Sequence, residues 1–373
     1  ETLGWRSIFF ANVVVAVVAF LLVLIFVPES KAAVARSFDL PGQLLFIVGV
    51  GVLTFALIQG PQDGWGSPLI LGCFGVAAVL GATFVLTELR VHEPMMDVRV
   101  FKDGVYTTAI VTIFVVLFGV YGTFLIVTQY FQNVREFSPE EAGFLMLFNT
   151  VPTIILSPLA GRIAAKRGGR TPTLTGAALA TIGFAMIGIG APIALWIVLV
   201  GLAVVGAAGG LAIAPATNVA MSSIPAERSG MASGIMSAQR ALGSTAGFAI
   251  MGSVLALVLA GRLPADLEQA IPDASQRQAV VDQVVEDANP SAAIALIGPG
   301  RLIPDPDGAV YTDEVVDDAD RAFTSGIRAA ELLAAVLAAG AFVLGYLKFP
   351  WGSLAEQEER EAARLATDEA AAT

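Results

Sequence analysis

Side chains that could move a proton are scarce in the long apolar runs of this chain. A carboxylate inside such a run is costly if the run crosses a membrane, so it tends to be functional. Glu88 ends one run, Glu140 and Glu141 precede another, and Glu331 enters the last one. We expect none of them at mid-depth. Glu331 is the best local candidate for a proton site, but the preferred interpretation is a weak interfacial pair with Arg328, three residues away.

A second group combines amides and hydroxyls with aromatic rings on two consecutive apolar runs. It comprises Phe118, Tyr121, Phe124, Gln129, Tyr130, Gln132, Asn133, Phe148, Asn149, Thr150 and Thr153. If these side chains face one another, they line an apolar cavity with sparse polar groups, which suits amphiphilic organic molecules, cations among them. The alternative is that the polar members join helices or anchor at the headgroup level.

Other kinds of chemistry find little support in the sequence. The chain has one histidine, His92, and one cysteine, Cys73. It contains no GxxxxGK[ST] phosphate-binding run, and its acids show no regular metal-ligand spacing. We therefore expect no enzyme, no ATP-driven pump, no cofactor or metal, and no nucleic-acid partner.

The elements that carry these residues follow from composition. The chain of 373 residues is 56% hydrophobic and 14% charged, and its mean hydropathy is +0.76. Nine runs are long enough to cross a hydrocarbon core of about 30 Å, and none alternates as a barrel strand would. The sequence predicts an all-α integral membrane bundle within a lipid bilayer. Its spans are 8–27, 41–60, 68–88, 105–130, 142–161, 172–191, 193–216, 236–260 and 329–348.

The distribution of lysine and arginine predicts the orientation of these spans. One side carries Lys31, Arg36, Arg90, Arg99, Lys102, Arg162, Lys166, Arg167, Arg170, Arg228, Arg240, Lys348, Arg360 and Arg364. The short segments of the other side carry Arg6 and Arg135. The cationic side is therefore expected to be cytoplasmic, with the charged tail 349–373 on it. The acid-rich stretch 261–326 is expected to be a partly helical extracytoplasmic loop.

Several segments resemble a known family when they are taken in order. "GWRSIFFANVVVAVVAFLLVLIFVPES" resembles the sixth span of major facilitator superfamily transporters of the fourteen-span drug:proton antiporter branch. "DLPGQLLFIVGVGVLTFALIQGPQDGWGSP" is similar to the first of two extra helices in that branch. "ELRVHEPMMDVRVFKD" and "TQYFQNVREFSPEEAGFLMLFNTVP" resemble the entry to the second lobe and its first outer turn. "ERSGMASGIMSAQRALGSTAGFAIMG" resembles the penultimate span.

The resemblance implies a division of the chain and a function. Residues 1–30 would be the last helix of the first lobe, 31–104 a two-helix insert and linker, and 105–348 the six-helix second lobe. The fold would be a major facilitator superfamily bundle with about nine transmembrane helices in this fragment. The family implies alternating access in the plasma membrane and export of a small amphiphilic substrate against protons. Its coupling acids lie largely in the first lobe, so the proton site is expected upstream, among five spans that precede this sequence.

The run "GRIAAKRGGR" resembles the superfamily's loop signature. Gly161, Lys166, Gly168 and Arg170 match it, whereas Ala165 stands where the signature has Asp. In the family this loop clamps neighbouring helix ends, so Gly161, Arg162, Lys166, Arg167, Gly168 and Arg170 form a candidate gate loop. The alternative is that the cluster is a plain positive-inside anchor.

Small residues and prolines suggest close packing of the last spans. Gly206, Gly210, Gly243 and Gly247 are candidate helix-packing glycines. Such glycines are common in any multispan bundle, so packing is preferred to a rocking mechanism as their explanation. Arg240 is expected to snorkel at the cytoplasmic edge of its span, with a contact to an inner gate as the alternative.

Two other functions remain open at this point. The first is an exporter or importer of a lipid, siderophore or metabolite, because a fold does not fix a substrate. The second is a non-transporting membrane scaffold that binds a partner through 261–326.

Overall fold

A computed structural model of the chain describes residues 6–26, 39–91, 94–224, 228–266 and 313–349. The chain forms two units, Glu1–Phe38 and Asp39–Thr373. The first unit contributes α1, Ser7–Phe26. Large apolar side chains are exposed along α1, from Phe9 to Phe26. A helix of this kind needs an apolar surrounding.

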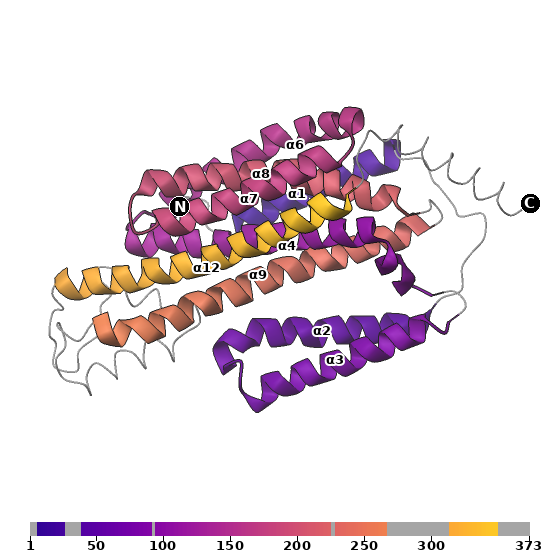
Figure 1. The fold of residues 1–373 in the computed structure, drawn as a ribbon, viewed down its shortest axis with the longest axis horizontal. Helices are drawn as coiled ribbons and strands as arrows, with labels where there is room; N and C mark the ends of the chain where they lie inside the picture. The colour runs from indigo at the N-terminus through magenta and orange to yellow at the C-terminus, as the bar shows by residue number, and fades with distance from the viewer. Residues whose placement is uncertain (1–5, 27–38, 92–93, 225–227, 267–312, 350–373) are drawn as a thin grey trace, which may run out of the picture. The chain divides into compact units, whose positions relative to one another are not determined.

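Six long helices make the body of the second unit. They are α4 (Gly104–Gln129), α6 (Leu147–Arg167), α7 (Arg170–Gly190), α8 (Leu195–Ser222), α9 (Ser229–Asp266) and α12 (Asp313–Lys348). They run side by side along a common direction (Figure 1). We call this body the second lobe. α7 packs between α8 and α12, α4 contacts α8, α9 and α12, and α6 lies against α8.

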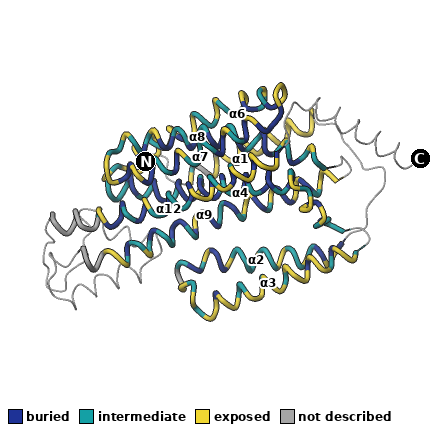
Figure 2. Tube along the Cα trace, in the orientation of Figure 1, coloured by how far each residue is buried: buried dark blue, intermediate teal, exposed yellow. Residues whose placement is uncertain are grey.

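The interior of the second lobe is built from the central helices. Phe184 of α7, Leu202 of α8 and Met251 of α9 are almost fully buried, and buried positions concentrate on α4, α7 and α8 in Figure 2. By contrast, α6 exposes Ile154 and Ile155. This combination of a packed centre and an apolar outer surface is the arrangement expected of helices in lipid.

Glycines allow the helices of the second lobe to approach closely. A Cβ at Gly243 would lie 3.1 Å from the carbonyl oxygen of Phe114, and one at Gly210 would lie 2.9 Å from that of Thr153. Gly247 contacts the backbone of Phe118, and Gly206 that of Asn149. The four candidate packing glycines therefore lie at the α4–α9 and α6–α8 contacts.

Two further helices, α2 (Leu40–Asp63) and α3 (Pro68–Glu88), form a hairpin. They pack on each other, and α2 also packs on α9. The indole Nε1 of Trp65, in the turn between them, donates a hydrogen bond to Ser253 Oγ of α9 at 2.8 Å. The hairpin is thereby docked on the second lobe.

Local sequence explains where these helices begin and end. The carboxylate of Asp103 accepts hydrogen bonds from the backbone N–H groups of Val105 and Tyr106, and it thereby caps the start of α4. Ser138 and Glu141 form a capping box at the start of the short helix α5, Pro139–Leu145. Gly168 ends α6 with φ of 79°, a conformation that favours glycine.

Eight helices in the described ranges are long and apolar enough to cross a membrane, and they correspond to the second to ninth predicted spans. The predicted fifth span is divided into α5 and α6. α4 continues as a π-helical turn, Tyr130–Val134. The apolar part of α1, Asn12–Phe26, is shorter than the other eight, so the first span stays a prediction.

Helices enter the acid-rich stretch 261–326 from both sides, and its place outside the membrane stays a prediction. Residues 261–266 belong to α9 and 313–326 to α12. Hydropathy marks only the apolar part of a helix, and both helices continue into polar sequence. Residues 267–312, and the tail after Phe349, lie outside the described residues.

Candidate functional site

A hollow of about 330 Å³ opens between α4, α8 and α9. It is lined by Leu117, Tyr121, Ile213, Arg240, Ala241 and Ser244. The lining is mixed, because aliphatic side chains alternate with a phenol, a hydroxyl and a guanidinium. None of these six residues is acidic. We call this feature the inner hollow.

The most polar group of the inner hollow is Arg240 of α9. Its Nη2 donates a hydrogen bond to Thr217 Oγ1 of α8 at 2.8 Å. That hydroxyl in turn donates to the backbone carbonyl of Ile213 at 2.7 Å. The guanidinium is thus held on the wall of the hollow, well inside α9, rather than directed along the helix to its end. The predicted span begins at 236, whereas α9 begins at Ser229, and the place of Arg240 at the cytoplasmic edge of the membrane stays a prediction.

One aromatic residue, Tyr121, lines the inner hollow. Tyr121 is 40% exposed, and its ring lies 5.7 Å from that of Phe248 on α9. Phe124 is half-buried, Phe118 is buried at the α4–α9 contact, and Phe148 is exposed on α6. Of the four aromatic residues singled out in the sequence, Tyr121 is the one that lines the inner hollow.

The polar residues singled out with them do not form one cluster. Gln129 accepts a hydrogen bond from Asn133 at 2.9 Å, while Asn149 Nδ2 donates to the carbonyl of Leu202 at 3.3 Å. Tyr130 is buried, and its hydroxyl donates to the carbonyl of Ala191 at 3.1 Å. Gln132 is half-buried. The contacts of Asn149 and Tyr130 join different helical segments, whereas that of Gln129 lies within the end of α4.

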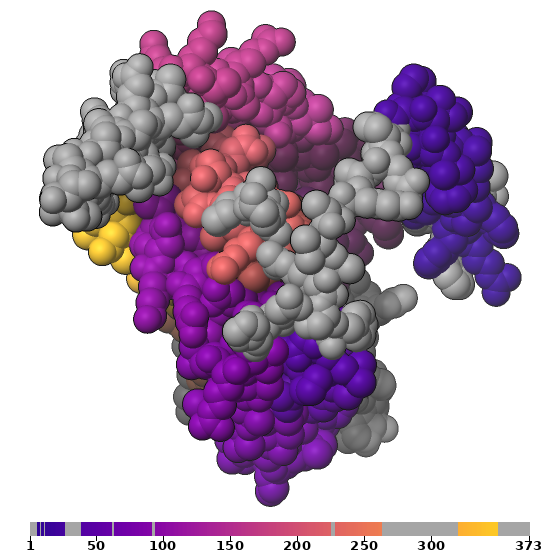
Figure 3. All heavy atoms as spheres, turned by 90° about the vertical axis from the view of Figure 1, so that its right-hand side faces the viewer, coloured from indigo at the N-terminus to yellow at the C-terminus, as the bar shows by residue number. Residues whose placement is uncertain are grey.

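The candidate gate loop is divided between exposed and buried residues. Arg162, Lys166 and Arg167 are exposed on the last turns of α6, and Gly161 is half-buried there. Arg170 is different, because it begins α7 and is 5% exposed. We call the end of the second lobe that carries these residues the basic end (Figure 3, which shows α6 in pink and the start of α9 in salmon).

Arg170 joins the start of α7 to the end of α12. Its Nη2 donates to the carbonyl of Tyr346 at 2.7 Å, and its Nη1 donates to that of Phe349. The guanidinium also lies 5.2 Å from the centre of the Tyr346 ring. A cation is favourable beside the carbonyl groups that end a helix. One member of the basic cluster therefore holds two helix ends together.

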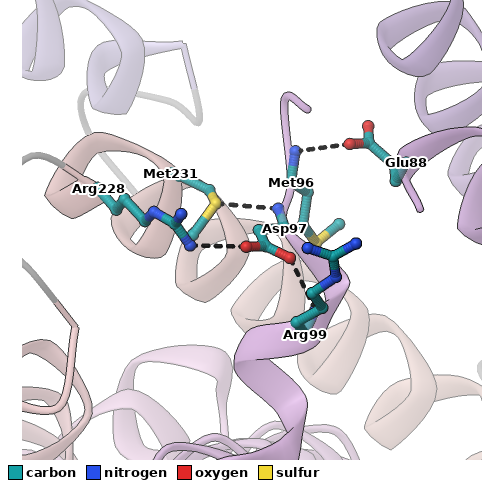
Figure 4. A network of polar contacts seen from close by, with 6 residues as sticks. All are labelled: Glu88, Met96, Asp97, Arg99, Arg228 and Met231. Atoms are coloured by element: carbon teal, nitrogen blue, oxygen red, sulfur yellow. Dashed lines mark hydrogen bonds and ion pairs between the residues drawn. The ribbon is translucent and has the colours of Figure 1, made fainter. Parts of the chain in front are cut away.

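A second group of contacts at the basic end joins the start of α9, and Arg228 just before it, to the segment before α4. Arg228 Nη1 and Asp97 Oδ2 form an ion pair at 2.6 Å, and the backbone N–H of Asp97 points to the sulfur of Met231 at 3.1 Å (Figure 4). Nearby, Glu88 at the end of α3 accepts the N–H of Met96 at 3.1 Å. A series of polar contacts thus joins the hairpin to the linker and the linker to the start of α9.

The predicted pair between Glu331 and Arg328 is wrong. Glu331 is fully buried in the second lobe, whereas Arg328 is exposed. Thr123 Oγ1 of α4 donates a hydrogen bond to Glu331 Oε2 at 3.1 Å. The predicted last span begins at 329, whereas the apolar part of α12 extends from Asp320. Eleven residues of helix precede Glu331 there, so the carboxyl lies inside the span.

Two further observations limit the chemistry of this part of the chain. Within the described ranges, no group of three or more His, Cys, Asp or Glu residues could hold a metal ion. A hollow of about 410 Å³ between α2 and α3 is lined by apolar residues such as Phe46, Leu53 and Phe74. It offers no side chain that could orient a polar ligand.

Long apolar helices with a packed core and a hollow between α4, α8 and α9 define a multi-pass helical membrane protein. Residues 1–248 match the Major Facilitator Superfamily. The chain belongs to this superfamily.

Several relatives of known role are similar to the chain. It is 44% identical over 347 residues to multidrug resistance protein Stp of Mycobacterium tuberculosis, covering 93% of the chain and 63% of Stp. It is 38% identical over 351 residues to drug efflux pump JefA of the same organism, covering 94% of the chain and 68% of JefA. The tetracenomycin C resistance and export protein of Streptomyces glaucescens is 30% identical over 312 residues, 81% of the chain and 56% of that protein. The chain therefore spans a little under two thirds of the length of Stp.

Proposed function

We propose that the protein of which this chain is part is a secondary active exporter of drugs or other amphiphilic organic molecules. Export is driven by protons that move in the opposite direction, and the two lobes alternate in access to a shared site. The observation that carries this proposal is the inner hollow, with its mixed aromatic and polar lining, in a relative of multidrug pumps.

The chemistry of the inner hollow supports an amphiphilic substrate. Tyr121 offers a ring surface, and the guanidinium of Arg240 offers hydrogen-bond donors. An apolar wall with few polar groups suits organic molecules that combine apolar surface with a few polar atoms. Because Arg240 makes this wall positively charged, substrates with hydrogen-bond acceptor groups are favoured over simple cations.

The orientation and division of the chain belong to the same proposal. The basic end would face the cytoplasm of a plasma membrane, and the C-terminus would lie there. Residues 1–30 would be the last helix of the first lobe, 31–104 the insert and linker, and 105–348 the second lobe. The exposed residues Arg162, Lys166 and Arg167 would serve the orientation, and Arg170 the joining of α7 to α12.

The full-length gene, expressed in cells that lack their own efflux pumps, tests this function. Drug accumulation should be lower than in control cells, and an uncoupler of the proton gradient should abolish the difference. An unchanged difference with the uncoupler would exclude proton coupling, and equal accumulation in both cells would exclude export.

Two variants test the inner hollow. Tyr121→Ala removes a stacking surface worth about 0.5–1.5 kcal/mol, so resistance to individual drugs should change by about 2- to 10-fold and unequally. Phe144→Ala is the matched control, because Phe144 is 71% exposed on α5, away from the hollow. Equal resistance profiles of the two variants at equal protein level would remove the inner hollow from the substrate path.

A further inference from the structure

Glu331 is a fully buried carboxyl in the middle of the second lobe. It lies on α12, about 17 Å from Asp320 and about 26 Å from Lys348 for a rise of about 1.5 Å per residue. An ionised group at such depth is costly, and such residues are retained mainly where they act. The proposed function described above does not yet use it.

The surroundings of Glu331 hold one hydrogen-bond donor. Thr123 Oγ1 donates to Oε2 at 3.1 Å, and Oε1 has no partner among the described residues. On the third side, α7 approaches closely at Gly188, where an added Cβ would lie 3.1 Å from Glu331 Cβ. The carboxyl is thus enclosed by α4, α7 and α12 and left half satisfied.

The charged and titratable groups of the neighbouring elements are engaged elsewhere. On α9, Arg262 donates to Ser325 Oγ at 3.1 Å, and Arg240 donates to Thr217. On α7, Arg170 binds the carbonyls at the end of α12. Beyond α4, Arg135 donates to the Tyr130 hydroxyl at 2.7 Å.

The remaining groups of this kind lie away from the carboxyl. Tyr106 is buried near the start of α4, at the far end from Thr123, and Tyr121 lines the inner hollow. On α12 itself, Arg321 and Arg328 are exposed, Asp320 lies at the start of the apolar part, and Tyr346 and Lys348 lie at the opposite end. In the described part of the chain, no cation lies within ion-pair distance of Glu331.

The turn of α4 that contacts Glu331 is also the turn that lines the inner hollow. Thr123 points to Glu331, and Tyr121, two residues earlier, lies about 200° away around the helix and faces the hollow. Gly119 of this turn contacts the ring of Phe184. A Cβ at Gly122 would lie 3.0 Å from the carbonyl oxygen of Gly247. A movement of this turn would therefore change both the contact with Glu331 on one side of α4 and the lining of the inner hollow on the other.

We propose that Glu331 and Thr123 form a proton-binding site of the second lobe that is linked through α4 to occupancy of the inner hollow. This inference rests on the proposed function and places a coupling group in the second lobe. The carboxylate takes up a proton from water to become a carboxylic acid and returns it to water, and no other bond changes. Because the Thr123 hydrogen bond stabilises the carboxylate, a shift of α4 that breaks the contact changes the proton affinity. By linkage, protonation changes drug affinity by the same factor.

Purified full-length protein tests this site without relying on transport. Binding of a fluorescent drug substrate is measured against pH, and proton release on binding is followed with a pH indicator in weak buffer. One linked proton makes affinity change by up to tenfold per pH unit. Glu331→Gln, which mimics the neutral acid, should bind drug with a flattened pH profile and release fewer protons. Glu141→Gln, an exposed carboxyl on α5, is the matched control and should behave as the unmodified protein.

The same variant is then examined in proteoliposomes. Glu331→Gln should lose accumulation of drug against its gradient, while drug exchange down the gradient persists. An unchanged pH profile together with unchanged uphill transport would overturn the inference. Absence of any transport by the unmodified protein would instead overturn the proposed function, since the binding experiment is independent of it.

A milder variant covers the case in which Glu331→Gln does not fold. Thr123→Val keeps the carboxyl and removes its donor, so the pH midpoint of drug binding should move, while Glu331→Asp should retain a sloping profile. A midpoint that stays in place in Thr123→Val would also overturn the inference.

Discussion

Arg170 shows what a single cation can do at a helix junction. It is buried, and it donates to two carbonyl groups that end α12 while it begins α7. Its neighbours in sequence, Arg167 and Lys166, are exposed. Similar residues in one short basic run therefore have different roles, which depend on the helix that each belongs to.

Replacement of Arg170 should destabilise the second lobe. Arg170→Gln loses two charge-assisted hydrogen bonds worth about 1.5–3 kcal/mol each, so we expect the free energy of unfolding to fall by about 3–6 kcal/mol. Thermal unfolding of the full-length protein in detergent measures the change. Arg162→Gln is the matched control, because Arg162 is exposed on α6 and should cost less than about 0.5 kcal/mol. Equal losses for the two variants would contradict the role assigned to Arg170.

At this scale the sequence predicted residue types better than contacts. Tyr121 was singled out and lines the inner hollow, whereas Asn149 was grouped with Gln129 and bonds instead to Leu202. Helical period shows which residues share a face, but the partner of that face depends on tertiary packing. Arg240 and Thr217 were missed as a pair because they lie on different helices, 23 positions apart.

The α4–α9 contact depends on glycine at the scale of the helix. Gly243 and Gly247 are one turn apart on α9, and each lies against the backbone of α4, at Phe114 and Phe118. Backbones at this distance leave no room for a side chain between them. The tight approach also fixes the face of α4 that carries Tyr121 toward the inner hollow.

A methyl group at this contact should separate the helices. Gly247→Ala places a Cβ against the carbonyl of Phe118, and we expect a loss of about 1–3 kcal/mol in stability. The matched control is Gly234→Ala in the same helix, where an added Cβ meets open space and helix propensity favours alanine by up to about 1 kcal/mol. Thermal unfolding of both variants checks this prediction. If Gly247→Ala were as stable as Gly234→Ala, the close approach of α4 and α9 would be in doubt.

The lengths of the helices could not be predicted as well as their existence. Apolar runs located eight helices, yet α9 and α12 extend beyond the runs into polar sequence, and α5 is separated from α6. Hydropathy responds to contact with lipid, whereas helix ends depend on caps such as Asp103 and Gly168. For this reason Glu331 was predicted at the edge of its span, whereas it lies in the interior of the helix.

Across the whole molecule, the second lobe holds α9 and α12 together by contacts of their own. Arg262 donates to Ser325, and Gly326 lies against Leu255. Each contact joins a residue before the segment 267–312 to a residue after it. The pairing of the two helices therefore has support that does not depend on that segment.

Removal of residues 267–312, with a short glycine-serine linker in their place, should spare drug export. Membrane level and drug accumulation should stay within about twofold of the unmodified protein, since the helix pair is retained. A scaffold that acts through this loop would instead lose its activity in the deletion. Surface biotinylation and the accumulation assay distinguish these outcomes.

The docking of the α2–α3 hairpin has a consequence for how the molecule would move. Trp65, in the turn of the hairpin, is bonded to Ser253 of α9, and Asp97, in the linker that follows the hairpin, is paired with Arg228 just before α9, so the hairpin and its linker are tied to this part of the second lobe at two separate points. If the two lobes rock against each other, the hairpin would move with the second lobe as one rigid body and would not act as a hinge between the lobes. The hairpin would make the moving lobe wider on one side. The lipids around that side would therefore be displaced more than the other surrounding lipids in each transport cycle.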